Sequence, residues 1–265
     1  MKIKELVSAL ERFAPLPLQD GFDNAGLQIG LTDAEATGAL LCLDVTEAVL
    51  DEAIALGHNL VISHHPLIFK GYKSITGKDY VERCMLKAIK NDIVIYSAHT
   101  NLDNAYGGVN YKIAEKIGLK NLQVLEPKEN SLQDDLMQAG AGIVGELDEP
   151  ETELEFLKRI KKTFEVGCVR HNRLTGREIQ KVALCGGAGA FLLPQAIRAG
   201  ADVFITGEIK YHDYFGHEGD ILMAEIGHYE SEQYTKEIFY SIIRDLFPNF
   251  ALQLSKINTN PIKYL

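Results

Sequence analysis

The sequence lacks paired cysteines. Its four cysteines, Cys42, Cys84, Cys168 and Cys185, are scattered and form no Cys-x-x-Cys motif. A disulfide framework or a zinc finger requires clustered cysteines at short spacings, so we expect neither. Scattered thiols are typical of small core residues in a reducing compartment, and we therefore expect a cytoplasmic protein.

Long apolar segments and an excess of positive charge are also absent. No stretch approaches the roughly 20 apolar residues that a membrane-spanning helix needs. Residues 1–13 carry Glu5 and Glu11 and have the pattern of an amphipathic helix, not of a signal peptide. The chain has 27 Lys and Arg against 37 Asp and Glu, a net charge of −10. Because nucleic acids bind clustered basic residues, we expect no nucleic-acid partner. Because no stretch is apolar enough to span a bilayer, we expect no membrane partner either.

Apolar segments alternate with helical patterns along the chain of 265 residues. Strands are predicted over 39–43, 60–62 and 93–96, with helices over 46–56 and 79–90 between them. This alternation favours parallel βαβ units in an α/β fold. Further strands are predicted over 141–144, 165–169, 182–185, 201–206 and 221–226, and further helices over 152–163, 191–199 and 229–246. An acidic turn is predicted at 148–151.

Two adjacent histidines follow the apolar run 60–62. His64 and His65 stand at the carboxyl end of this predicted strand, where open α/β sheets place their ligands. Neighbouring residues on an extended backbone point to opposite sides, so such a pair suits two metal ions better than it chelates one. The alternative is a pair of ordinary loop histidines.

Two further pairs of possible ligands follow apolar strands. His99 and Asp103 are spaced as His-x-x-x-Asp, and His228 and Glu232 as His-x-x-x-Glu. Residues four apart share one face of a helix, so His228 and Glu232 can bind one cluster together, although such pairs also occur on plain helix surfaces. Imidazole and carboxylate ligands without a thiolate suit zinc, manganese or iron, and a carboxylate can bridge two ions.

The second half of the sequence repeats a pattern of the first. Residues 57–63 and 200–206 both read as a glycine, two linking residues, three apolar residues and one hydroxyl residue. Duplication of an α/β unit and chance similarity both remain open. The nearby turn 186–189 could bind a phosphate through its backbone N–H groups, or it could be a tight strand-to-helix turn.

We predict two α/β lobes with mostly parallel strands and a metal site in the cleft between them. Residues 1–126 form the first lobe, which carries His64, His65 and Asp103, and residues 127–227 form the second. Residues 228–265 contain the metal-binding helix and pack back on the first lobe.

Five stretches resemble the GTP cyclohydrolase I type 2 homologues, also called Nif-three-like proteins. They are residues 22–30, 62–69, 98–110, 206–213 and 227–232. The resemblance implies an α/β fold with two divalent metal ions per subunit and a ring-shaped homohexamer. Phe22 stands where many members have Trp, and the chain lacks the domain that longer members carry between their two halves.

The resemblance also implies a ligand set. His65 and Asp103 would bind one ion, His64 and His228 the other, and Glu232 both. His99 is our candidate proton shuttle, because an imidazole titrates near neutral pH; a structural role for it is the alternative.

The function implied by the resemblance is hydrolysis of a small molecule, GTP or another nucleotide. In GTP, water would open the imidazole ring of guanine at C8 and release formate. A dinuclear phosphoesterase, a regulatory or metal-handling protein without turnover, and a scaffold with incidental histidines are the alternatives.

Overall fold

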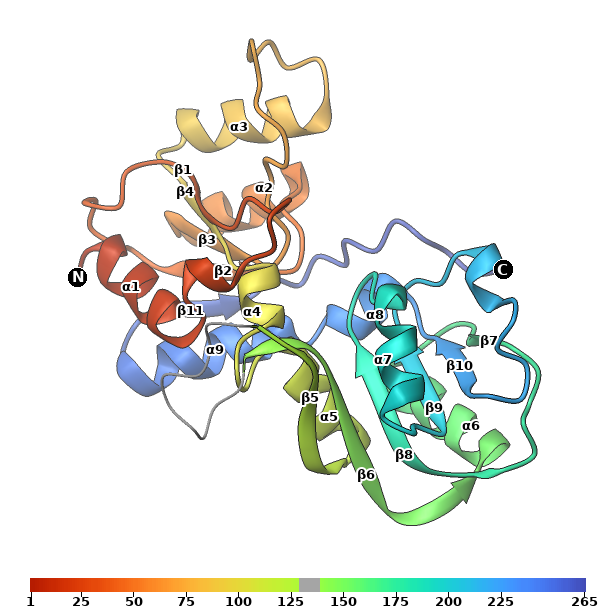
Figure 1. Cartoon of the computed structure of the whole chain (residues 1–265). Helices are drawn as coiled ribbons and strands as arrows, with labels where there is room; N and C mark the ends of the chain where they lie inside the picture. Colours follow the sequence, from red (N-terminus) through yellow and green to blue (C-terminus); the bar gives the residue numbers. More distant parts are fainter. Residues whose placement is uncertain (129–138) are drawn as a thin grey trace. The chain divides into compact units, whose positions relative to one another are not determined.

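The computed structural model describes residues 1–128 and 139–265 and divides the chain into two compact units (Figure 1). Unit 1 comprises Met1–Leu102 and Thr235–Pro261, and unit 2 comprises Asp103–Tyr234 and Ile262–Leu265. The chain therefore passes between the units at 102/103, 234/235 and 261/262, whereas we placed the boundaries at 126/127 and 227/228. Of the predicted second lobe, residues 129–138 lie outside the described part.

Unit 1 is built on a five-stranded sheet in the order β1-β4-β3-β2-β11. The strands are β1 (Gly26–Ile29), β2 (Ala39–Cys42), β3 (Leu60–Ser63), β4 (Val94–Ser97) and β11 (Leu252–Leu254). β11, β2, β3 and β4 are parallel, and β1 runs antiparallel to β4. Every residue of β2, β3 and β4 is buried, which explains why these strands read as continuous apolar runs.

Helices cover both faces of this sheet. The helices are α1 (Ile3–Phe13), α2 (Glu47–Leu56), α3 (Tyr80–Lys90) and α9 (Thr235–Leu246), with the short η1 (Leu16–Leu18) and α4 (Thr100–Asp103) between them. Leu40, Val61 and Ile95 pack in one core cluster with residues of α2 and α3. Their strand neighbours point to the other face, where α1 and α9 pack together and α9 contacts β2.

Unit 2 is built on a six-stranded sheet in the order β5-β6-β8-β9-β10-β7. The strands are β5 (Lys120–Pro127), β6 (Gly140–Thr152), β7 (Arg170–His171), β8 (Glu178–Cys185), β9 (Val203–Thr206) and β10 (Leu222–Glu225). Only β8, β9 and β10 are parallel to one another; the pairs β5/β6, β6/β8 and β10/β7 are antiparallel. The α/β prediction is confirmed, but this sheet is mixed.

The helices of unit 2 are α5 (Val109–Ile117), α6 (Glu153–Thr163), α7 (Leu193–Arg198) and α8 (His228–Glu232), with η2 (Ala190–Leu192) and η3 (Tyr211–Tyr214). α5 and α6 contact β6 and β8, and residues of α7 share a core cluster with Phe204 and Met223. The strands β3 and β9, which lie in the repeated pattern, each follow a glycine with φ of 69°, Gly57 and Gly200. Both strands end in a buried hydroxyl residue.

Three predicted elements are wrong. The strand predicted over 165–169 is absent, because α6 ends at Thr163 and the chain turns through Glu165, whose φ is 55°. The acidic turn predicted at 148–151 lies within β6. The helix predicted over 229–246 is two helices, α8 and α9, interrupted where the side chain of Gln233 donates to the Phe164 carbonyl (3.1 Å).

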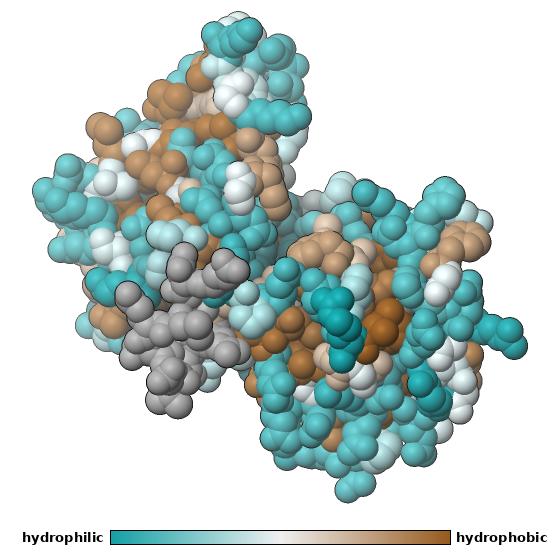
Figure 2. Space-filling model, in the orientation of Figure 1, coloured by the Kyte–Doolittle hydropathy of each residue, from teal (hydrophilic) through white to brown (hydrophobic). Residues whose placement is uncertain are grey.

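Surface and covalent features agree with the sequence. All four cysteines are free, so the expectation that they form no disulfide is confirmed. Within 1–128 and 139–265, none of the helices has the length and apolar character to cross a membrane. In Figure 2, hydrophilic side chains cover most of the visible face, and hydrophobic ones gather in local patches.

The core of unit 2 provides a test of the fold. Phe204 on β9 is 0% exposed, so Phe204→Ala should lower the free energy of unfolding by about 3–5 kcal/mol, through lost burial and a residual cavity. The matched control, Leu154→Ala on α6, removes a side chain that is 53% exposed and should cost less than about 0.5 kcal/mol. Urea denaturation measures both; equal midpoints for the two variants would contradict this packing.

Candidate metal centre

The histidine pair of unit 1 follows β3 directly, as predicted. The backbone N–H groups of His64 and His65 both donate to the Leu43 carbonyl (3.1 and 3.0 Å), so the end of β2 fixes the pair. The prediction that the two rings point to opposite sides is wrong, because the chain bends at both residues and the ring centroids lie 4.9 Å apart. The two imidazoles therefore face one region.

Oxygen acceptors hold both rings of this pair at Nδ1. The Nδ1 of His64 lies 2.9 Å from the Ala98 carbonyl, and that of His65 lies 2.7 Å from Asp44 Oδ1. Burial alone would raise the pKa of Asp44, but the hydrogen bonds from His65 and Thr259 and the attraction to His65 hold it below its usual value. Asp44 is therefore a carboxylate that accepts the Nδ1 proton of His65.

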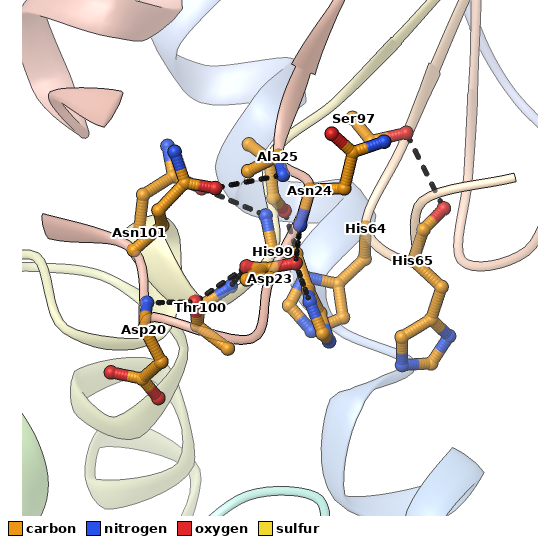
Figure 3. Close-up of polar contacts among 12 residues, drawn as sticks. Asp20, Asp23, Asn24, Ala25, His64, His65, Ser97, His99, Thr100 and Asn101 are labelled. Atoms are coloured by element: carbon orange, nitrogen blue, oxygen red, sulfur yellow. Dashed lines mark hydrogen bonds and ion pairs between the residues drawn. The ribbon is translucent and has the colours of Figure 1, made fainter. Parts of the chain in front are cut away.

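His99 lies beside the pair. One ring nitrogen from each of His64, His65 and His99 lies within 4.8 Å of the others. His99 Nδ1 is 2.8 Å from Asp23 Oδ1, while the other oxygen of Asp23 accepts from the Thr100 N–H (3.0 Å) and hydroxyl, as Figure 3 shows. His99 is thus held at Nδ1 as His64 and His65 are, and its catalytic role stays a prediction.

The other three predicted residues belong to unit 2. Asp103 ends α4, and His228 and Glu232 are the first and last residues of α8. His228 Nε2 lies 3.1 Å from Glu232 Oε2, and a carboxylate oxygen of Asp103 lies within 4.8 Å of one of Glu232. The helical spacing therefore brings His228 and Glu232 together, as predicted. Asp103 lies in unit 2, whereas we predicted it in the lobe of the histidine pair.

One arrangement recurs at His64, His65, His99 and His228. The Nδ1 of His228 lies 2.7 Å from Glu208 Oε1, so each of the four rings faces a carboxylate or carbonyl oxygen through Nδ1. These oxygens only accept, so Nδ1 carries a proton, and Nε2 is the nitrogen that a neutral ring can offer to an ion. Metal-binding histidines are oriented in this way by acceptors behind the ring. The residues present fit a metal site with imidazole and carboxylate ligands.

Gly187 makes room for Glu232. A Cβ at this position would lie 2.3 Å from Glu232 Oε1, and the φ of Gly187 is 60°. The backbone therefore approaches the carboxylate more closely than any side chain would permit.

The turn 186–189 does not offer its amides to a phosphate. The N–H groups of Gly186, Gly187 and Gly189 donate to Asn110 Oδ1, Ser231 Oγ and Thr206 Oγ1 (2.9, 3.0 and 2.9 Å). These bonds make the segment a tight turn beside Glu232, and the phosphate alternative is not supported.

The sequence did not reveal the acids that orient the histidines. Asp23 and Glu208 lie in the stretches 22–30 and 206–213, which carry the family resemblance, and Asp44 lies just after the predicted strand 39–43, but no local pattern pairs any of the three with a histidine. A usable signal exists in the sequence, because Asp44 and Glu208 each come two residues after a strand, β2 and β9, and the carboxyl ends of parallel strands are where ligands bind.

Three comparisons relate the chain to known proteins. The profile of the Duf34/NIF3 (NGG1p interacting factor 3) family matches residues 1–261. The "GTP cyclohydrolase 1 type 2 homolog" of Clostridium perfringens is 37% identical over 235 residues, which are 88% of this chain and 87% of that protein. Among solved structures, a Staphylococcus aureus hypothetical protein has a TM-score of 0.89 at 32% identity, covering 100% of this chain and 99% of that one. A Bacillus cereus protein related to NIF3 has a TM-score of 0.89 at 26% identity, with the same coverage.

The Asp23 network predicts a dependence of stability on acid. Burial would raise the pKa of Asp23, but hydrogen bonds from His99 and Thr100 lower it from 3.8 to about 2. A lowered pKa in the folded state stabilises the fold above pH 3.8, and this contribution disappears as pH falls to about 2. Asp23→Asn should therefore be less stable than the parent by about 2 kcal/mol at neutral pH.

The difference in the free energy of unfolding between the parent and Asp23→Asn should shrink between pH 4 and pH 2. Urea denaturation of metal-free protein across this pH range measures it, and a difference that stays constant with pH would contradict the assignment.

Gly187→Ala tests the space beside Glu232. The new Cβ would displace the carboxylate and strain the backbone by roughly 1–2 kcal/mol. We expect weaker retention of zinc or manganese during dialysis against a chelator, measured by elemental analysis. Gly176→Ala is the matched control, because its φ is 79° with nothing within 4 Å of the added Cβ. Equal metal retention in both variants would contradict a ligand role for Glu232 in this position.

Proposed function

Because the chain belongs to the Duf34/NIF3 family, we propose that it is a metal-dependent hydrolase with two divalent ions per subunit. The observation that carries the proposal is the common orientation of His64, His65, His99 and His228, each with Nδ1 held by an oxygen. Four imidazoles held at Nδ1 in this way each present Nε2 in a fixed direction, as the histidine ligands of a metal ion do.

The ligand set is the one that the family resemblance implies. His65 and Asp103 would hold one ion, His64 and His228 would hold the other, and Glu232 would serve both. Three features of the single units support it: the His64 and His65 rings face one region, His228 and Glu232 approach within 3.1 Å, and Asp103 lies near Glu232. Zinc, manganese and iron all accept such ligands.

Bound divalent ions would supply a water of lowered pKa and would polarise the group that it attacks. The protein's own part is to orient and to move protons. Asp23 fixes the ring of His99 through Nδ1, so His99 can take a proton at Nε2 and return it without rotating. His99 is therefore the proposed proton carrier, placed beside the ligand pair.

The name of the Clostridium perfringens relative suggests GTP as the substrate. In that reaction, one water adds at C8 of guanine and opens the imidazole ring to a formamide, and a second water hydrolyses the formamide so that formate leaves and an amine remains. A dinuclear phosphoesterase would release phosphate from the same nucleotide. A metal-binding regulatory or metal-handling protein would bind the ions without turnover.

Elemental analysis of the purified full chain tests the metal centre. We expect about two divalent ions per chain, and His65→Ala or Glu232→Ala should lower this content, because each removes a ligand. His171→Ala is the matched control, since His171 is exposed and its Nδ1 contacts only a neighbouring carbonyl, that of Asn172 (2.7 Å). Metal-free parent protein, or parent-like content in both ligand variants, would refute the centre.

Formate and phosphate assays on the metal-loaded chain with GTP separate the candidate activities. We expect formate release that falls about 100-fold or more in His99→Ala, because proton transfer contributes roughly 10²–10⁴-fold to such reactions. Phosphate without formate would favour the phosphoesterase. Bound metal with neither product, across a panel of nucleotides and phosphoesters, would favour the binding protein.

The proposal extends to assembly and location. The family resemblance implies a homohexamer, and the scattered thiols favour the cytoplasm; light scattering of the purified chain measures the number of subunits.

A further inference from the structure

The segment that follows β11 ends beside the carboxylate that orients His65. The Oγ1 of Thr259 donates to Asp44 Oδ2, while Asp44 Oδ1 accepts from His65 Nδ1 (2.7 Å). Thr259 is 215 residues from Asp44 in sequence, so only the fold brings the two together. Both oxygens of Asp44 are thereby used, one for the ligand histidine and one for this hydroxyl.

Other contacts fix this segment in unit 1. The hydroxyl of Ser255 donates to Glu52 Oε2 (2.5 Å), the N–H of Lys256 donates to Glu52 Oε1 (3.0 Å), and Ile257 packs against the core of α2 and α3. The position of Thr259 therefore depends on an anchored chain, not on a free tail.

We propose that Thr259 is a positioning residue, which acts through Asp44 to hold His65 in the orientation that binds a metal ion. The inference rests on the proposed metal centre. A carboxylate with one free oxygen can rotate about its last bond, and the bond from Thr259 removes that freedom. The hydroxyl therefore restricts the motion of the acceptor behind the ring, and through it the direction of the Nε2 lone pair.

Three substitutions separate the hydroxyl from its surroundings. Thr259→Val keeps the shape but removes the donor, Thr259→Ser restores the donor without the methyl group, and Ser255→Ala breaks a different bond of the same segment. The probe is zinc, and the measurement is its affinity for the full chain by competition with a chromogenic chelator. Removing a direct partner of a ligand typically costs 10- to 100-fold, so for Thr259→Val we expect a loss of roughly three- to tenfold.

Thr259→Ser and Ser255→Ala should retain the affinity of the parent. Parent-like affinity in Thr259→Val would overturn the proposal. An equal loss in Thr259→Ser would assign the effect to the methyl group, and an equal loss in Ser255→Ala would assign it to the segment as a whole; either result also overturns it.

A second readout works without metal. In metal-free protein, NMR should show faster exchange of the His65 Nδ1 proton with water in Thr259→Val than in the parent or in Thr259→Ser. Unchanged exchange would overturn the positioning role. A parent chain that binds no zinc would refute the proposed function, and the exchange measurement would still decide the role of Thr259 at His65.

Discussion

An imidazole can bind a metal ion only through a nitrogen that carries no proton, so the location of the proton decides what the ring can do. Here the acceptors behind the rings make that choice. Asp44, Asp23 and Glu208 each hold one Nδ1, and the Ala98 carbonyl holds a fourth. The ligand capacity of each unit depends on these bonds, because without them the rings would adopt either tautomer and several orientations.

Three of these four acceptors, Asp44, Ala98 and Glu208, come just after strands of the two sheets. Asp44 follows β2 and its partner His65 follows β3, while Glu208 follows β9 and its partner His228 follows β10. Within each unit, the carboxyl ends of parallel strands therefore set the spacing between acid and imidazole. Asp23 comes from a turn before β1 and is fixed by donors from His99, Thr100 and its neighbour Asn24. A buried carboxylate without such donors would be costly, which ties the stability of this turn to its role behind His99.

Much of this arrangement could be predicted from sequence where local patterns decide it. The strands β2, β3, β4 and β9 read as apolar runs because both of their faces are buried. Since such a run shows where its strand ends, the histidines that follow could be placed at strand ends. β11 could not be found, since its three half-buried residues are a strand only through pairing with β2. The contacts between the acids and the histidines could not be predicted, because the partners lie 20 to 76 residues apart and only the fold brings them together. The path of β6 through its acidic stretch also depends on pairing, with an irregular register against β8 between Glu146 and Glu151.

The order of the segments has a consequence for biosynthesis. Unit 1 needs β11 to cover the edge of β2, yet all of unit 2 except its last four residues is encoded between β4 and β11. A ribosome must therefore translate residues 103–234 before β11 can join the first sheet. During that interval the nascent polypeptide carries an open, apolar β2 edge, the kind of surface that recruits chaperones or leads to aggregation. All six strands of unit 2 are translated before β11, so the sheet of unit 2 can form before the sheet of unit 1 is complete.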